Sequence, residues 1–199
     1  MDASNSGSEE TSQASMKELL GITYSEFDNV VGPQLRFQYP EKTLSPETFE
    51  DVSSYVIVGK HLSERILTVQ IHSQDDSSTR QFMNFSVAIE NPKYDRNTLL
   101  FAIGFVLSEG VDCEIYEPVL KKIARTLIAL ETESEYLFQD ANKTHLRQVF
   151  AAIYRDLSQK KEIFVVPSLS LCPLPLYYVR QLKYLMCRVL MTPTISAQS

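Results

Sequence analysis

The chain has 199 residues, 44% of them hydrophobic and 22% charged, which is enough apolar material for the core of one domain. A net charge of −6 excludes a sequence-independent nucleic-acid binder, which needs a cationic surface. We expect no transmembrane segment, because no run of about 18 uncharged apolar residues occurs. The polar N-terminal stretch lacks the apolar core of a secretory signal, and the three cysteines cannot form a disulfide framework. We therefore expect a cytoplasmic protein with reduced thiols.

Charge and composition divide the chain into three parts. All 25 acidic residues lie at or before Glu162, whereas the segment beyond it carries three cations and several prolines. We predict a disordered Ser-rich tail over 1–16, one domain over 17–162 and a divergent C-terminal tail over 163–199. Residues 176–191 are compatible with a helix at a membrane surface, but we favour an alternative or truncated C-terminus that was not selected to fold.

The domain opens with a predicted hairpin. Alternating apolar residues indicate short strands over 22–27 and 34–39. Between them lie the turn-forming pairs Asp28-Asn29 and Gly32-Pro33. We therefore expect the two strands to pair antiparallel.

A helix is predicted to begin at Pro46. Ser45 is its expected N-cap, and Pro46 occupies the first helical position, where a missing N–H has no cost. Leu44 and Phe49 have the spacing of a hydrophobic staple. One face of this helix is expected to be apolar, formed by Phe49, Val52 and Val56.

Three more strands are predicted downstream, over 66–71, 81–90 and 99–107. The last is a nearly unbroken apolar run that follows the Asn91-Pro92 turn signal. Such a run is typical of a strand that is covered on both faces. We therefore expect residues 99–107 to form a buried central strand.

Two amphipathic helices close the domain, over 117–137 and 142–159. The resulting order is β-β-α-β-β-β-α-α, which predicts the α+β class with an antiparallel sheet flanked by helices. At the end of the first helix Glu131, Glu133 and Glu135 crowd together without an evident chemical role.

Signatures of a free-standing enzyme are absent from the sequence. It lacks a phosphate-binding GxxxxGK[ST] loop, a GxSxG nucleophile motif and an HExxH zinc motif. The three histidines are scattered, and the Asp75-Asp76 pair lies in a polar run typical of a solvated loop. Cys113 follows an apolar strand and is expected to be an inert thiol. We expect neither a metal nor a cofactor in this chain.

Five blocks of the sequence carry a specific signal when they occur together: Tyr24-Ser-Glu-Phe27, Val31-Gly-Pro-Gln-Leu-Arg-Phe-Gln-Tyr-Pro40, Tyr94-Asp-Arg-Asn-Thr-Leu-Leu-Phe-Ala-Ile-Gly-Phe105, Tyr116-Glu-Pro-Val-Leu-Lys-Lys122 and Leu130-Glu-Thr-Glu-Ser-Glu-Tyr136. The first two resemble the opening of a longin domain, and all five, in their order and spacing, resemble the nitrogen permease regulator 2-like family. The resemblance covers roughly residues 20–159.

The resemblance implies a longin-like, five-stranded antiparallel sheet between helices. It also implies a subunit of the GATOR complex (SEACIT in yeast), which activates GTP hydrolysis by Rag-type GTPases and restrains the TOR kinase when amino acids are scarce. The implied partners are a nitrogen permease regulator 3-like protein as heterodimer, a DEP-domain subunit and the GTPases themselves. The implied location is the cytoplasm, with recruitment to the lysosomal or vacuolar membrane surface.

By the same resemblance, Arg96 matches the family's arginine finger, which acts in trans on the GTPase. Tyr94, Asp95 and Asn97 belong to the same loop and are expected to shape it, and Asp95 is a candidate ion-pair partner for Arg96. The residues alone also allow a plain solvated turn, because Lys93 and Asp95 are charged neighbours. The alternative functions are a non-catalytic longin scaffold, an exchange-factor subunit that binds a small GTPase, or an inactive regulatory isoform.

Overall fold

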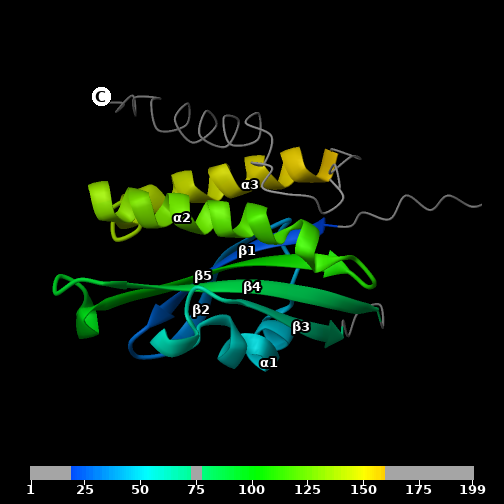
Figure 1. The fold of residues 1–199 in the computed structure, drawn as a ribbon, viewed down its shortest axis with the longest axis horizontal. Helices are drawn as coiled ribbons and strands as arrows, with labels where there is room; N and C mark the ends of the chain where they lie inside the picture. The colour runs from blue at the N-terminus through cyan, green and yellow to red at the C-terminus, as the bar shows by residue number, and fades with distance from the viewer. Residues whose placement is uncertain (1–18, 73–77, 160–199) are drawn as a thin grey trace, which may run out of the picture.

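The computed structural model describes residues 19–72 and 78–159. Over these residues the chain forms an α+β fold of the longin-like type, in which helices cover both faces of a five-stranded antiparallel sheet (Figure 1). The two predicted tails, 1–16 and 163–199, and the Asp75-Asp76 pair lie outside the described residues. The proposed domain limits therefore stay predictions.

The sheet has the strand order β2-β1-β5-β4-β3, with every neighbouring pair antiparallel. Its strands are β1 (Leu19–Asp28), β2 (Gly32–Tyr39), β3 (Ile66–His72), β4 (Thr79–Glu90) and β5 (Thr98–Ser108). The predicted hairpin is confirmed as β1 and β2. The predicted central strand is also confirmed, because β5 lies in the middle of the sheet and is buried from Phe101 to Leu107.

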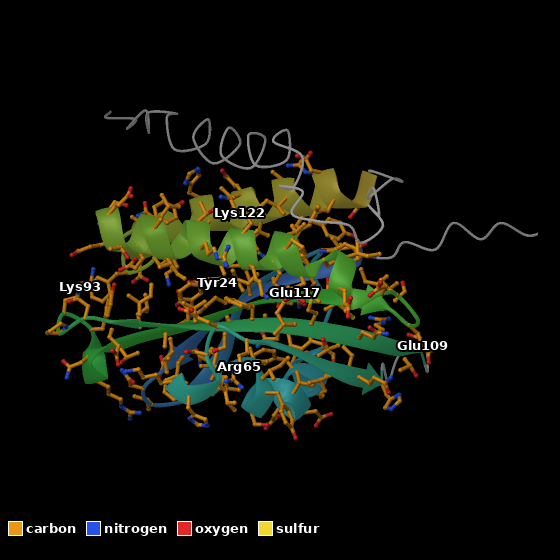
Figure 2. All side chains as sticks on the ribbon, in the orientation of Figure 1. Tyr24, Arg65, Lys93, Glu109, Glu117 and Lys122 are labelled. Atoms are coloured by element: carbon orange, nitrogen blue, oxygen red, sulfur yellow. The ribbon has the colours of Figure 1, made fainter. Side chains whose placement is uncertain are left out.

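Helices α2 (Glu117–Ser134) and α3 (Lys143–Gln159) cover one face of the sheet, and α1 (Pro46–Val56) covers the other (Figure 1). Alternate residues of each strand therefore enter two separate apolar cores, the larger of them beneath α2 and α3. Tyr24 of β1 lies in this larger core, between the sheet and the helices (Figure 2). None of the described helices is long and apolar enough to cross a membrane.

The start of α1 follows the sequence prediction. The side chain of Ser45 accepts a hydrogen bond from the backbone N–H of Thr48 at 3.1 Å, as an N-cap does. Leu44 and Phe49 lie in the same apolar cluster, as a hydrophobic staple requires.

The end of α2 differs from the prediction. The helix ends at Ser134 rather than at residue 137, because Glu135 adopts a left-handed backbone with φ 55°. The N–H of Glu135 still donates to the carbonyl of Glu131 at 2.9 Å, which closes the last turn. The chain then turns, and Leu137 enters the core from outside the helix.

Candidate functional site

The loop that joins β4 to β5 carries Arg96. Three backbone hydrogen bonds close it: Asn91 N–H to the Asn97 carbonyl at 3.0 Å, Tyr94 N–H to the Asn91 carbonyl at 3.1 Å, and Asn97 N–H to the Tyr94 carbonyl at 2.9 Å. The loop is therefore a compact turn at one end of the sheet. Lys93 of this loop lies at the opposite end of the molecule from Glu109, which follows β5 (Figure 2).

Arg96 has an unusual backbone. Its φ of 57° and ψ of 20° lie in the left-handed region, and Asn97 beside it has a φ of 58°. This region costs a residue with a Cβ about 1–2 kcal/mol, and such strain is found preferentially at functional sites. Both side chains are exposed.

The side chain of Arg96 contacts the turn between β1 and β2. Its Nη2 donates to the backbone carbonyl of Asn29 at 3.2 Å, and Asn29 Nδ2 donates to Asp95 Oδ2 at 3.4 Å. Within the described part of the chain Arg96 forms no ion pair with Asp95, so the suggestion of a local pair was wrong. The two neighbouring side chains instead contact different groups of the same asparagine.

Tyr94 connects the β4–β5 loop to helix α2. Its side chain is buried, and its hydroxyl donates to Oε1 of Glu131 on α2. Glu131 is itself fully buried, and its other oxygen, Oε2, accepts the backbone N–H groups of Leu137 at 2.6 Å and Phe138 at 3.0 Å. A buried carboxylate is tolerated only when its oxygens are satisfied in this way.

Glu131 was not recognised in the sequence as a site residue. The signal was present, because Leu120, Ile123 and Leu127 form the buried stripe of α2, and position 131 continues that stripe one turn later. A charged residue on the buried face of a helix needs a buried partner, and Tyr94 provides it.

Lys93 completes this cluster. Its Nζ lies 3.3 Å from Oε1 of Glu131, 3.2 Å from Oε1 of Glu135 and 4.7 Å from the centre of the Tyr94 ring. Burial acts to lower the pKa of the Lys93 ammonium, but its contacts with Tyr94, Glu135 and Glu131 outweigh this and raise it. Burial, reinforced by the hydrogen bond to Glu131, raises the pKa of the Tyr94 phenol.

A pocket of about 340 Å³ lies beside the loop. Arg96 and Lys60 bring positive charge to it, and Lys60 is paired with Glu90. The apolar part of the lining comes from β1, from β5 and from the connection between α2 and α3. The lining residues are Phe27, Asn29, Lys60, Tyr94, Asp95, Arg96, Thr98, Leu99, Leu100 and Phe138.

Exposed apolar side chains occur on the turn that Arg96 contacts and in the lining of the pocket beside it. Val30 and Val31, which follow the Asn29 that Arg96 contacts, are 93% and 69% exposed, and Phe138 is 52% exposed. The turn that carries the valines is ordered, because the Asp28 carboxylate accepts their backbone N–H groups at 2.9 and 3.1 Å. Single exposed apolar residues are common, but a group around one exposed arginine is typical of a surface that contacts another protein.

The structure thus brings Tyr94, Asp95, Arg96 and Asn97 into one turn, with Tyr94 buried and the other three exposed.

Cys113 is half-buried, and its Sγ lies 2.6 Å from Oε1 of Gln81. Among the residues of 19–72 and 78–159, no three His, Cys, Asp or Glu side chains gather where they could hold a metal ion.

Comparison with known proteins decides the family. A sequence model described as nitrogen permease regulator 2 matches residues 17–171, most of the chain. The chain belongs to the nitrogen permease regulator 2 family. The resemblance inferred from the sequence blocks is thereby confirmed.

Three relatives illustrate the range of the family. The GATOR complex protein NPRL2 of Drosophila melanogaster is 32% identical over 146 residues, which are 73% of this chain and 34% of the fly protein. The nitrogen permease regulator 2 homolog of Schizosaccharomyces pombe is 27% identical over 72% of this chain and 35% of its own length. Nitrogen permease regulator 2 of Saccharomyces cerevisiae is 26% identical over 58% of this chain and 18% of its own length. The chain thus spans about a third, or less, of each of these relatives.

Proposed function

We propose that this chain is a regulatory subunit of a GATOR-type complex and that Arg96 acts in trans as an arginine finger on a Rag-type GTPase. The fly relative supports the first part, because its name describes a GATOR complex protein. The observation that carries the second part is the geometry of Arg96. The guanidinium of Arg96 is exposed and forms no ion pair with its neighbour Asp95. Its turn has a strained, left-handed backbone, and Tyr94 of the same turn is fixed to the buried carboxylate of Glu131.

The chemistry of GTP hydrolysis suits such a residue. As the bond to the transferring phosphoryl group breaks, negative charge builds up on the phosphoryl and leaving-group oxygens, and a guanidinium placed against them stabilises it. An arginine finger contributes roughly a thousandfold to a hundred-thousandfold in rate. Arginine serves better than lysine because its planar group offers several donors at once. The nucleotide and its Mg²⁺ belong to the GTPase, so this chain needs no cofactor and is not itself the hydrolase.

The surroundings of Arg96 support contact with a protein partner. A finger must leave bulk water when it engages, and apolar side chains around it exclude that water. The exposed residues Val30 and Val31 follow the Asn29 that Arg96 contacts, and the exposed Phe138 lines the same pocket as Arg96.

The wider assignment follows from the family. We place the chain in the cytoplasm, paired with a nitrogen permease regulator 3-like protein and a DEP-domain subunit, and recruited to the lysosomal or vacuolar membrane surface. There the complex would restrain the TOR kinase in the amino acid starvation response. The rival proposal is a non-catalytic longin scaffold, an exchange-factor subunit or an inactive isoform.

The two proposals differ in the effect of Arg96→Ala. The chain is co-purified with its regulator 3-like partner, and single-turnover GTP hydrolysis by the Rag-type GTPase is measured together with the affinity of the complex for it. We expect the stimulated rate to fall by about a thousandfold or more while binding is retained. Arg65→Ala, which removes an exposed arginine just before β3, is the matched control and should leave the rate unchanged. Equal stimulation by wild type and Arg96→Ala would favour the scaffold.

A further inference from the structure

The carboxylate of Glu131 lies at a junction between three segments. It belongs to α2, its Oε1 receives the hydroxyl of Tyr94 from the β4–β5 loop, and its Oε2 receives the N–H groups of Leu137 and Phe138 from the connection to α3. Two walls of the pocket beside Arg96 are thus attached to one side chain: Tyr94 on the loop, and Phe138 on the connection. The rings of Tyr94 and Phe138 are in contact as well, with centroids 5.6 Å apart.

We propose that Glu131 is a positioning residue for Arg96 and acts through the hydroxyl of Tyr94. This inference rests on the proposed function of Arg96. It adds a named residue, buried on α2, that sets how well the arginine is held.

The need for such a residue follows from the construction of the loop. Its three backbone hydrogen bonds join loop residues to one another, and none of them connects the turn to the helices. Tyr94 and Lys93 provide the side-chain attachments to the α2 end, and both reach Glu131 Oε1. On the other side Arg96 and Asp95 make two contacts with Asn29, at 3.2 and 3.4 Å.

Arg96 is close enough in sequence to depend on this attachment. It follows Tyr94 by two residues, and its left-handed backbone conformation persists only where the surrounding structure enforces it. Transition-state stabilisation by a charged donor depends on geometry, and a displacement of about 1 Å can cost about a hundredfold in rate. Release of Tyr94 should therefore lower the rate of hydrolysis in the bound complex more than it lowers binding.

The main test is Tyr94→Phe, which removes the hydroxyl and keeps the ring. Its matched control is Tyr24→Phe, which removes a hydroxyl that donates to another buried carboxylate, Glu26 Oε1, at 2.9 Å. Two readouts are taken on the full chain with its partner: hydrogen exchange of the Tyr94 and Asn97 amides, and single-turnover hydrolysis over a range of complex concentrations. For Tyr94→Phe we expect these amides to exchange about tenfold faster. We expect the saturated rate to fall by about tenfold to a hundredfold, with the half-saturating concentration unchanged.

A second variant tests the carboxylate itself. In Glu131→Gln the remaining oxygen is needed by the N–H groups of Leu137 and Phe138, so the new amide group faces Tyr94 and the Lys93 ammonium. That arrangement replaces an acceptor by a donor, and it should lower the saturated rate in the same direction as Tyr94→Phe. The double variant, Tyr94→Phe with Glu131→Gln, should be no slower than the slower of the two single variants, because both substitutions break the same hydrogen bond between Tyr94 and Glu131.

The outcomes separate this inference from the proposed function. If wild type gives no stimulation, the proposed function fails, and hydrogen exchange alone decides whether Glu131 orders the loop. If wild type stimulates and Arg96→Ala does not, then a Tyr94→Phe variant with wild-type rate and exchange overturns the positioning role. An equal effect of Tyr24→Phe on both readouts would also overturn it, since the effect would then be general loosening.

Discussion

Two buried clusters in this protein use the same chemical groups for different purposes. In each, a buried glutamate accepts a hydrogen bond from a tyrosine hydroxyl and pairs with a lysine: Tyr24, Glu26 and Lys143 in one, Tyr94, Glu131 and Lys93 in the other. The Glu26 cluster connects β1 with α3, and it also includes Arg36 of β2, whose Nε lies 3.0 Å from Glu26 Oε2. These elements are already fixed by the β-ladder and the core.

The Glu131 cluster connects irregular segments instead. On one side is the β4–β5 loop with Arg96, and on the other are two backbone amides just after α2. The difference shows where buried charge is needed. Regular elements are held by backbone ladders and apolar packing, whereas the turn that carries Arg96 lies between two strands and outside the ladder, so a buried carboxylate fixes it to α2.

The largest difference between the clusters should appear in stability. Glu131→Ala leaves a buried tyrosine hydroxyl and the Leu137 and Phe138 amides without their acceptor, and it should lower the free energy of unfolding by about 3–5 kcal/mol. Glu26→Ala should cost less, about 1–3 kcal/mol, because the side chains of Arg36 and Lys143 are 40% and 26% exposed and can turn to water. Urea unfolding of both variants measures the two losses.

Equal losses of stability, or a larger loss for Glu26→Ala, would contradict the distinction between the Glu131 cluster, which fixes a loop, and the Glu26 cluster, which joins elements that are already held by the sheet and the core. A changed slope of the unfolding free energy against urea concentration in either variant would indicate a change in the surface exposed on unfolding.

A smaller effect is expected from substitutions on the outer surface beside Arg96. The turn next to Arg96 exposes Val30 and Val31, and neither side chain contributes to the two buried cores. Val30→Ser combined with Val31→Ser should weaken binding to the GTPase by about tenfold and leave the unfolding temperature unchanged.

Tyr55→Ser is the control for this pair of substitutions, because Tyr55 is a 53% exposed aromatic residue on α1. Calorimetric titration of the GTPase measures the affinities. Weaker binding by Tyr55→Ser than by the double valine variant would place the contact surface away from Arg96.

A further effect is expected at alkaline pH. Burial raises the pKa of Tyr136 to about 12, and it also raises those of Tyr24 and Tyr94. A raised pKa in the folded state means that folding favours the neutral phenol. The associated stability is complete below about pH 10, the ordinary tyrosine pKa, and it is lost as the pH rises toward the folded-state value.

We therefore expect urea midpoints to fall between about pH 10 and pH 12, and Tyr136→Phe to reduce that fall. Phenolate absorbance followed across the same range monitors the titration. A midpoint that stays constant over this range would be incompatible with buried neutral phenols.

Much of the fold could be predicted because local signals agreed with tertiary packing. The cap at Ser45, the turn between β1 and β2 and the apolar run of β5 each had one physical explanation, and each is observed. The end of α2 was predicted too far along the chain because Leu137 continues the apolar spacing. Its burial comes instead from a turn after Glu135, which Glu131 helps to hold through the Leu137 amide.

The candidate site was predicted only in part for a similar reason. The loop and Arg96 followed from a resemblance between sequence blocks, and their roles remain proposals. The connection from Tyr94 to Glu131 spans 37 residues, so no local pattern contains both partners. Asp95 was only a candidate ion-pair partner for Arg96, named because it is adjacent in sequence; the two side chains contact different groups of Asn29 instead.

The proposed role of Arg96 is to stabilise, with its guanidinium, the charge that develops in the transition state of GTP hydrolysis. The most direct measurement is the affinity of the complex for the Rag-type GTPase loaded either with GDP alone or with GDP and aluminium fluoride, a mimic of the planar phosphoryl group. Catalysis by differential binding predicts that wild type prefers the mimic strongly and that Arg96→Ala loses this preference while it still binds the GDP form. The same preference in wild type and Arg96→Ala would contradict the claim.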